Sequence, residues 1–102
     1  MIEKALKNAK GVILWHRDGL GGFNSFDIFV RKGFEGEYKR LKESLYDVNC
    51  SIAAAFSEKH PEFIFLGSED LCHIDDINIA MREMLWSLKA EGFIEVNEEV
   101  VK

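Results

Sequence analysis

The sequence predicts an α+β fold, with two long helices packed together beside a short N-terminal helix and a small antiparallel sheet. Two apolar stripes with the 3-and-4 residue spacing of a helix predict the long helices, over about residues 37–58 and 75–90. Two apolar runs joined by a glycine-rich segment predict a hairpin near the N-terminus. The 102 residues are 47% hydrophobic, so we expect one domain, 1–102, with a core that needs no disulfide.

The N-terminal third is predicted to form a helix and the hairpin. Residues 2–10 place their apolar side chains on one side, which is typical of a short amphipathic helix. The run from Gly11 to His16 is apolar at successive positions, so we expect a strand covered on both faces. A turn over Asp18–Gly22 then leads to a return strand over Phe26–Arg31. The pattern leaves open whether the loop 18–25 binds a ligand.

The first long helix is predicted from about Glu37 to Glu58. Its apolar stripe has spacings of 3, 4, 3, 4 and 3 residues, at Tyr38, Leu41, Leu45, Val48, Ile52 and Ala55. A second apolar side indicates a central helix or an interface, and comprises Tyr46, Cys50, Ala53 and Ala54. Pro61 should end the helix, because proline disfavours helical backbone in the residue before it.

Residues 62–67 are short, apolar and aromatic, which is typical of a strand or of a loop packed into the core. Ser68, followed by two acidic residues, predicts the start of a short helix that Ser68 caps. These residues would therefore lead directly into the second long helix.

The second long helix has the clearest start and stop signals in the chain. Its core stripe again alternates steps of 3 and 4 residues, at Ile74, Ile77, Met81, Met84 and Leu88. Asp75 or Asp76 is the expected N-cap, and Gly92 is the expected left-handed residue just past the last turn. Phe93–Val96 should form a strand, paired with Glu99–Val101 as a second small hairpin.

The opposite side of this helix carries a second apolar strip. Ile79, Trp86 and Ala90 fall together at about 100° per residue, with Arg82 beside them. Two interpretations stay open: the N-terminal part of the chain covers the strip, or the strip is a partner interface, where Trp and Arg are enriched.

Residues 68–96 resemble the second half of a winged-helix domain. The short helix SEDLC, a break at His73-Ile74, a longer helix and then Gly-Phe-Ile carry the resemblance. It implies that the helix start, around Asp75–Asn78, faces DNA. This segment reads Asp-Asp-Ile-Asn, so we expect such a fold to serve protein contact instead.

No motif predicts catalysis, a cofactor or a metal, and we therefore expect a protein that is not an enzyme. The glycines after His16-Arg17-Asp18 lack the context of a phosphate loop or a kinase catalytic loop. The cysteines and nearby histidines lack zinc-ligand spacing, namely Cys50, His60, Cys72 and His73. The two cysteines are expected to be buried free thiols.

Charge is unevenly distributed along the chain. Residues 1–60 carry a net +2 and residues 61–102 a net −7. The basic residues that could contact nucleic acid cluster at Arg31, Lys32, Lys39, Arg40 and Lys42. No apolar run is long enough for a membrane helix, and no signal peptide is evident, so we expect a cytoplasmic protein.

These observations favour a small acidic interaction or regulatory module that is not an enzyme and that binds a second copy of itself or another protein. The alternative is a winged-helix-like regulator that binds nucleic acid through the cluster at residues 31–42.

Overall fold

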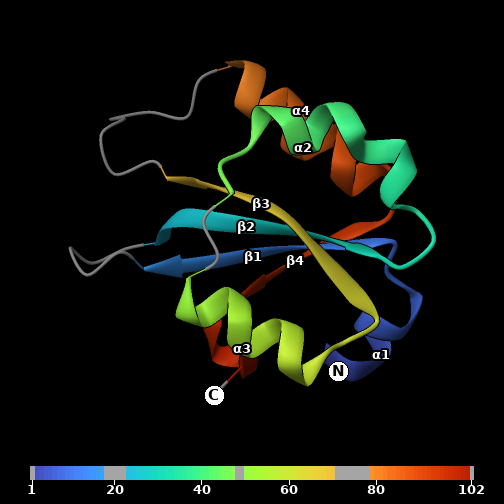
Figure 1. The fold of residues 1–102 in the computed structure, drawn as a ribbon, viewed down its shortest axis with the longest axis vertical. Coiled ribbons are helices and arrows are strands. Elements are labelled where there is room, and N and C mark those ends of the chain that lie inside the picture. Colours follow the sequence, from blue (N-terminus) through green and yellow to red (C-terminus); the bar gives the residue numbers. More distant parts are fainter. Residues whose placement is uncertain (1, 18–22, 48–49, 71–78, 102) are drawn as a thin grey trace.

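A computed structural model describes residues 2–17, 23–47, 50–70 and 79–101. These residues form one mixed sheet of four strands with helices on both faces, which confirms the α+β class (Figure 1). The elements are α1 (Ile2–Asn8), β1 (Gly11–Arg17), β2 (Phe23–Arg31), the 3-10 helix η1 (Glu35–Tyr38), α2 (Lys39–Ser44), α3 (Ser51–Lys59), β3 (Phe63–Asp70), α4 (Ile79–Ala90), β4 (Phe93–Asn97) and the 3-10 helix η2 (Glu98–Val101). Every helix among these residues is too short or too polar to reach across a lipid bilayer.

The strand order is β3-β2-β1-β4, and the predicted N-terminal hairpin is confirmed as β1 paired antiparallel with β2. β3 adds to β2 in the antiparallel direction, whereas β4 pairs parallel to β1. The predicted C-terminal hairpin is therefore wrong. Residues 98–101 turn into η2, and Val100 and Val101 pack against the core beside α3 instead of pairing with β4.

The sheet separates two apolar cores, because successive side chains of its central strands point to opposite faces. Val12 and Leu14 of β1 pack with Phe56 of α3 on one face. Ile13, between them, packs with Leu85 and Leu88 of α4 on the other face. The prediction of a strand covered on both sides is thus confirmed. Burying each such side chain contributes about 1.5–3 kcal/mol.

The long helix predicted over residues 37–58 is wrong. The chain leaves helical backbone at Leu45 (φ −103°, ψ 156°), and Tyr46 then pairs with Ser68 on the outer edge of β3. The next helix among the described residues begins at Ser51, as α3, on the opposite face of the sheet from α2 (Figure 1). The physical reason is that the apolar residues serve two different cores, Leu41 and Leu45 one, and Ile52 and Phe56 the other.

The crossing at the edge of β3 requires a residue without a side chain below it. A Cβ on Gly67 would lie 2.6 Å from the Leu45 Cβ and 3.0 Å from the Tyr46 carbonyl oxygen. Two backbone hydrogen bonds fix the crossing, from the Tyr46 amide to the Ser68 carbonyl (2.9 Å) and from the Ser68 amide to the Tyr46 carbonyl (2.8 Å). They also occupy part of an otherwise open sheet edge.

Ser68 therefore does not cap a helix. Ser68, Glu69 and Asp70 continue β3 and pair with residues 25–27 of β2. The remainder of the predicted short helix and the expected caps Asp75 and Asp76 lie outside the described residues. The end of the second long helix is as predicted: α4 stops at Ala90, and Gly92 has φ +111°. Within the described residues α4 comprises 12 residues and α2 only 6, and the predicted packing of two long helices is not confirmed.

Candidate functional site

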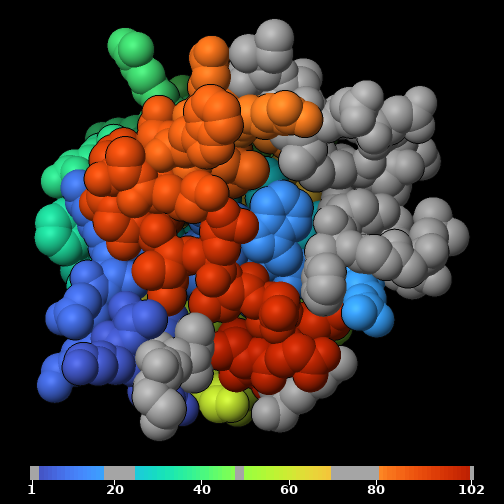
Figure 2. Space-filling view, turned by 180° about the vertical axis from the view of Figure 1, so that it is seen from behind, coloured from blue at the N-terminus to red at the C-terminus, as the bar shows by residue number. Residues whose placement is uncertain are grey.

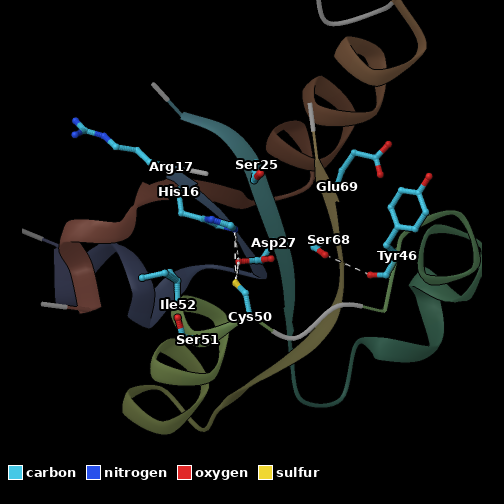
Figure 3. A pocket seen from close by; sticks show the side chains of 10 residues that line it. All are labelled: His16, Arg17, Ser25, Asp27, Tyr46, Cys50, Ser51, Ile52, Ser68 and Glu69. Carbon is cyan, nitrogen blue, oxygen red and sulfur yellow. Dashed lines mark hydrogen bonds and ion pairs between the residues drawn. The ribbon is translucent and has the colours of Figure 1, made fainter. Parts of the chain in front are cut away.

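A cavity of about 510 Å³ lies at the end of the sheet near the start of α3 (Figure 3). Its walls come from β1, β2, β3, the crossing segment and the first turn of α3. The lining residues are His16, Arg17, Ser25, Asp27, Tyr46, Cys50, Ser51, Ile52, Ser68 and Glu69. It is the place in the described chain where a buried carboxylate, an imidazole and a thiol meet.

Three side chains converge at this cavity, one from β1, one from β2 and one from the residue before α3. The His16 Nε2 atom lies 3.1 Å from the Asp27 Oδ2 atom. The Cys50 Sγ atom lies 3.8 Å from each of those two atoms. Figure 3 shows the three side chains pointing toward one another. We call these residues the His16–Asp27–Cys50 cluster.

Strand register places two members of the cluster. His16 pairs with Ser25, so Asp27, two residues further along β2, is its diagonal neighbour on the same face. This is the face that α3 covers, and Cys50 is the residue immediately before α3. The cluster therefore follows from strand pairing and from where α3 begins.

Burial dominates the electrostatics of the cluster. Asp27 is fully buried, and burial raises the pKa of its carboxyl, while the neighbouring His16 acts in the opposite direction. The second oxygen, Oδ1, has no hydrogen-bond partner within the described part of the chain. Burial is also the main cause that raises the pKa of the Cys50 thiol.

The geometry does not match a nucleophilic triad. In such a triad the imidazole uses one nitrogen toward the nucleophile and the other toward the carboxylate. Here Cys50 and Asp27 both approach the same His16 atom, Nε2. The raised pKa of Cys50 also disfavours the thiolate that would act as nucleophile. The cluster instead directs one sulfur, one nitrogen and one oxygen toward a common point.

The residues predicted for a partner interface lie together on α4. Arg82, Trp86 and Ala90 follow at four-residue intervals and all are exposed, with Trp86 65% accessible. We call them the α4 strip. Figure 2 shows α4, in orange, at the molecular surface beside β4 and η2 in red. Ile79 is the first residue of α4, but its side chain lies outside the described residues.

The predicted basic cluster is divided between two roles. The Arg31 guanidinium donates to the carbonyl oxygens of Leu6 and Ala9 at the end of α1, and it stacks 4.7 Å from the Phe63 ring centroid. It is thus engaged inside the fold. The other four side chains are exposed, namely Lys32, Lys39, Arg40 and Lys42. Three glutamates are interspersed with them and are also exposed, Glu35, Glu37 and Glu43.

The His16–Asp27–Cys50 cluster was missed from the sequence, because its members are separated by 11 and 23 residues. The metal ligands considered from the sequence do not come together with Cys50 in the described chain. The His60 Nδ1 atom lies 3.6 Å from the Glu62 Oε1 atom, and Cys72 and His73 are outside the described residues. One signal was present. His16 directly follows the apolar run Gly11–Trp15, and Asp27 lies between the apolar residues Phe26 and Ile28.

Comparison of the chain with protein-family models, with curated proteins and with solved structures finds no match.

Proposed function

We propose that this protein is a self-associating interaction module that is not an enzyme, and that two copies meet through the α4 strip. The observation that carries the proposal is the exposure of Trp86, whose surface is 65% accessible. The other side of the same helix packs into the core through Leu85 and Leu88. Tryptophan and arginine are enriched at the energetic centres of interfaces. The cytoplasmic location expected from the sequence stays a prediction.

The area of Trp86 sets the scale of the association. An aromatic side chain of this size offers up to about 250 Å², so burying the exposed 65% removes roughly 160 Å² from water, worth about 4 kcal/mol per copy. Two copies together gain about 8 kcal/mol. This is within the range of the free-energy cost that association pays in lost translational and rotational freedom. Trp86 is therefore necessary for the dimer, and the residues beside it must supply the remainder.

Charge on either side of Trp86 favours a second copy as the partner, with the two α4 helices parallel. Arg82 and Glu83 are both exposed. Around the helix axis they lie on opposite sides of Trp86, at about −40° and +60° from it. A two-fold axis parallel to the helices places Arg82 of one copy beside Glu83 of the other, twice. Antiparallel helices would instead bring Arg82 next to Lys89 of the second copy, a like charge that is already paired with Glu95 (2.7 Å), so that register lacks the Arg82–Glu83 pairs.

A charge exchange tests this register. Arg82→Glu should weaken the dimer, because each copy then places two carboxylates together. The double variant Arg82→Glu/Glu83→Arg should restore it, since the two signs are only interchanged. Sedimentation equilibrium gives the dissociation constants. Equal constants for the wild type and Arg82→Glu would exclude the parallel register.

A second candidate function is nucleic-acid binding, favoured by the exposure of four cations on and before α2, Lys32, Lys39, Arg40 and Lys42. Phe34, 37% exposed and with the Lys10 ammonium 5.2 Å from its ring centroid, adds an aromatic surface nearby. The winged-helix resemblance belongs with this candidate, and it too stays a prediction.

A further inference from the structure

We propose that the His16–Asp27–Cys50 cluster is a binding site for a zinc-class metal ion. The site is independent of the α4 strip, so the proposal goes beyond self-association and is tested separately. Its ligand atoms are Nε2 of His16, Oδ2 of Asp27 and Sγ of Cys50, contributed by β1, β2 and the residue before α3.

The separations of the three atoms match those around a tetrahedral zinc ion. Zinc bonds of about 2.0 Å to nitrogen, 2.1 Å to oxygen and 2.3 Å to sulfur place nitrogen and oxygen about 3.3 Å apart and sulfur about 3.6 Å from each. The observed separations are 3.1 Å for nitrogen to oxygen and 3.8 Å from sulfur to each. The in-plane centre of this triangle is about 2.1 Å from all three atoms, so an ion with zinc bond lengths lies close to that plane, displaced toward the side of its fourth ligand. An ion can therefore bind without movement of the backbone.

Hydrogen bonding alone leaves the cluster incompletely satisfied. The Nε2 atom of His16 carries at most one proton, so it can donate to Asp27 but not also to Cys50. The Cys50 thiol donates to the Asp27 Oδ2 atom over a long 3.8 Å, and its sulfur lies 3.8 Å from the His16 Nε2 atom. Asp27, fully buried, keeps one oxygen without a partner in the described chain. A buried polar atom without a partner is costly and calls for an explanation.

A divalent ion resolves the charge of the site. The Asp27 carboxylate and a Cys50 thiolate together carry −2, and a +2 ion neutralises them beside a carboxylate that is itself fully buried. The thiolate and imidazole favour zinc over calcium or magnesium, which prefer oxygen ligands throughout.

Three protein ligands leave one coordination position free on a tetrahedral ion. Structural zinc sites have four protein ligands, whereas three ligands and an exchangeable fourth position are typical of sites that bind water or a small molecule. The cluster lines the 510 Å³ cavity, which provides room for that fourth ligand. We therefore expect the ion to be exchangeable with chelators and to accept a small thiol or imidazole as its fourth ligand.

Metal titration of the untagged, reduced full chain tests the site. The chain is stripped with a chelator and titrated with Zn²⁺ by calorimetry, and with Co²⁺ by absorption spectroscopy. One ion should bind per chain, and the cobalt form should show a thiolate-to-metal charge-transfer band. Cys50→Ser should abolish that band. His16→Ala, Asp27→Asn and Cys50→Ser should each weaken zinc binding by at least about 100-fold, beyond the usual effect of losing an outer hydrogen-bond partner.

Matched controls distinguish this site from other metal ligands in the chain. His60→Ala, Cys72→Ser and His73→Ala should leave the stoichiometry, the affinity and the cobalt band unchanged. Circular dichroism of each stripped variant shows whether it folds, and Asp27→Asn keeps the size of the buried side chain. Failure of the folded wild type to bind zinc would overturn the proposal. So would binding that survives Cys50→Ser and Asp27→Asn but is lost in Cys72→Ser. Neither result would affect self-association through Trp86.

Discussion

Gly67 lies in β3 directly beneath the segment that carries the chain from one face of the sheet to the other. Gly67→Ala should destabilise the protein, because the new methyl group would lie 2.6 Å from the Leu45 Cβ and 3.0 Å from the Tyr46 carbonyl oxygen. Both neighbours are close to the backbone, so neither can move aside without shifting the crossing segment.

The expected cost has two parts. Forcing one methyl group into a packed site costs about 1–3 kcal/mol. Displacing the crossing segment also weakens the two backbone hydrogen bonds between Tyr46 and Ser68, at about 1 kcal/mol each. We therefore expect a loss of about 3–5 kcal/mol, which for a domain of this size lowers the melting temperature by roughly 12–40 °C.

Urea unfolding of matched glycine variants measures this cost. Gly36→Ala is the control, because its Cβ would meet no atom within 4 Å. Its stability should stay within about 1 kcal/mol of the wild type. If Gly67→Ala proved as stable as Gly36→Ala, the chain could not cross the sheet edge at this point, and an uninterrupted helix over residues 37–58 would again have to be considered.

Three further predictions follow from single contacts and from surface charge. Arg31→Lys should cost about 2–3 kcal/mol and increase hydrogen exchange in α1, because an ammonium lacks the planar group that reaches two carbonyls at once; unchanged exchange would contradict the capping role. Tyr38→Phe should cost about 1 kcal/mol, because the phenol donates to Glu91 (2.7 Å). Burial raises the pKa of Tyr38 above its ordinary value of 10.0, so this residue contributes stability below pH 10 that is lost as pH rises through the folded-state pKa. Urea unfolding near neutral pH and above about pH 10 should show that the wild type loses more unfolding free energy between the two pH values than Tyr38→Phe does. Equal losses would contradict this role of Tyr38. If the second candidate function is correct, alanine at Lys39, Arg40 and Lys42 should weaken duplex-DNA binding and lower the salt dependence of its binding constant by a slope of about 3. Fluorescence anisotropy of labelled DNA measures both, with Lys7→Ala as the control. Unchanged binding would remove that candidate.

The parts of the fold that could be predicted are those that local sequence determines. The glycine-rich segment between two apolar runs was sufficient for the β1–β2 hairpin, and Gly92 was sufficient for the end of α4. Both depend on residues within a few positions of each other. The same holds for the strand at Phe93–Val96, whose existence was predicted correctly although its partner was not.

The errors concern contacts between residues far apart in the chain. The spacing of Leu41, Leu45 and Ile52 is the same whether one helix buries them in one core or two helices bury them in two cores. Only the pairing of Tyr46 with Ser68 shows where the chain crosses. In the same way, the parallel pairing of β4 with β1 brings together residues about 80 positions apart, which no local pattern records.

The candidate site illustrates the same limit. His16 and Asp27 become neighbours through strand register, and Cys50 joins them because α3 begins where the crossing ends. The polar character of His16 and Asp27 was visible in the sequence, but not their proximity. The α4 strip could be predicted because helical periodicity alone groups Arg82, Trp86 and Ala90.

The measurement that tests the central claim most directly is the solution mass across a range of concentrations, by light scattering coupled to size exclusion. The wild type should approach twice the chain mass as concentration rises, and Trp86→Gln should remain at the mass of a single chain. Tyr46→Gln is the matched control, since Tyr46 is equally exposed at 64% but lies away from the α4 strip, and it should still dimerise. A wild type that remains monomeric at every concentration, or a Trp86→Gln variant that dimerises equally well, would contradict self-association through α4.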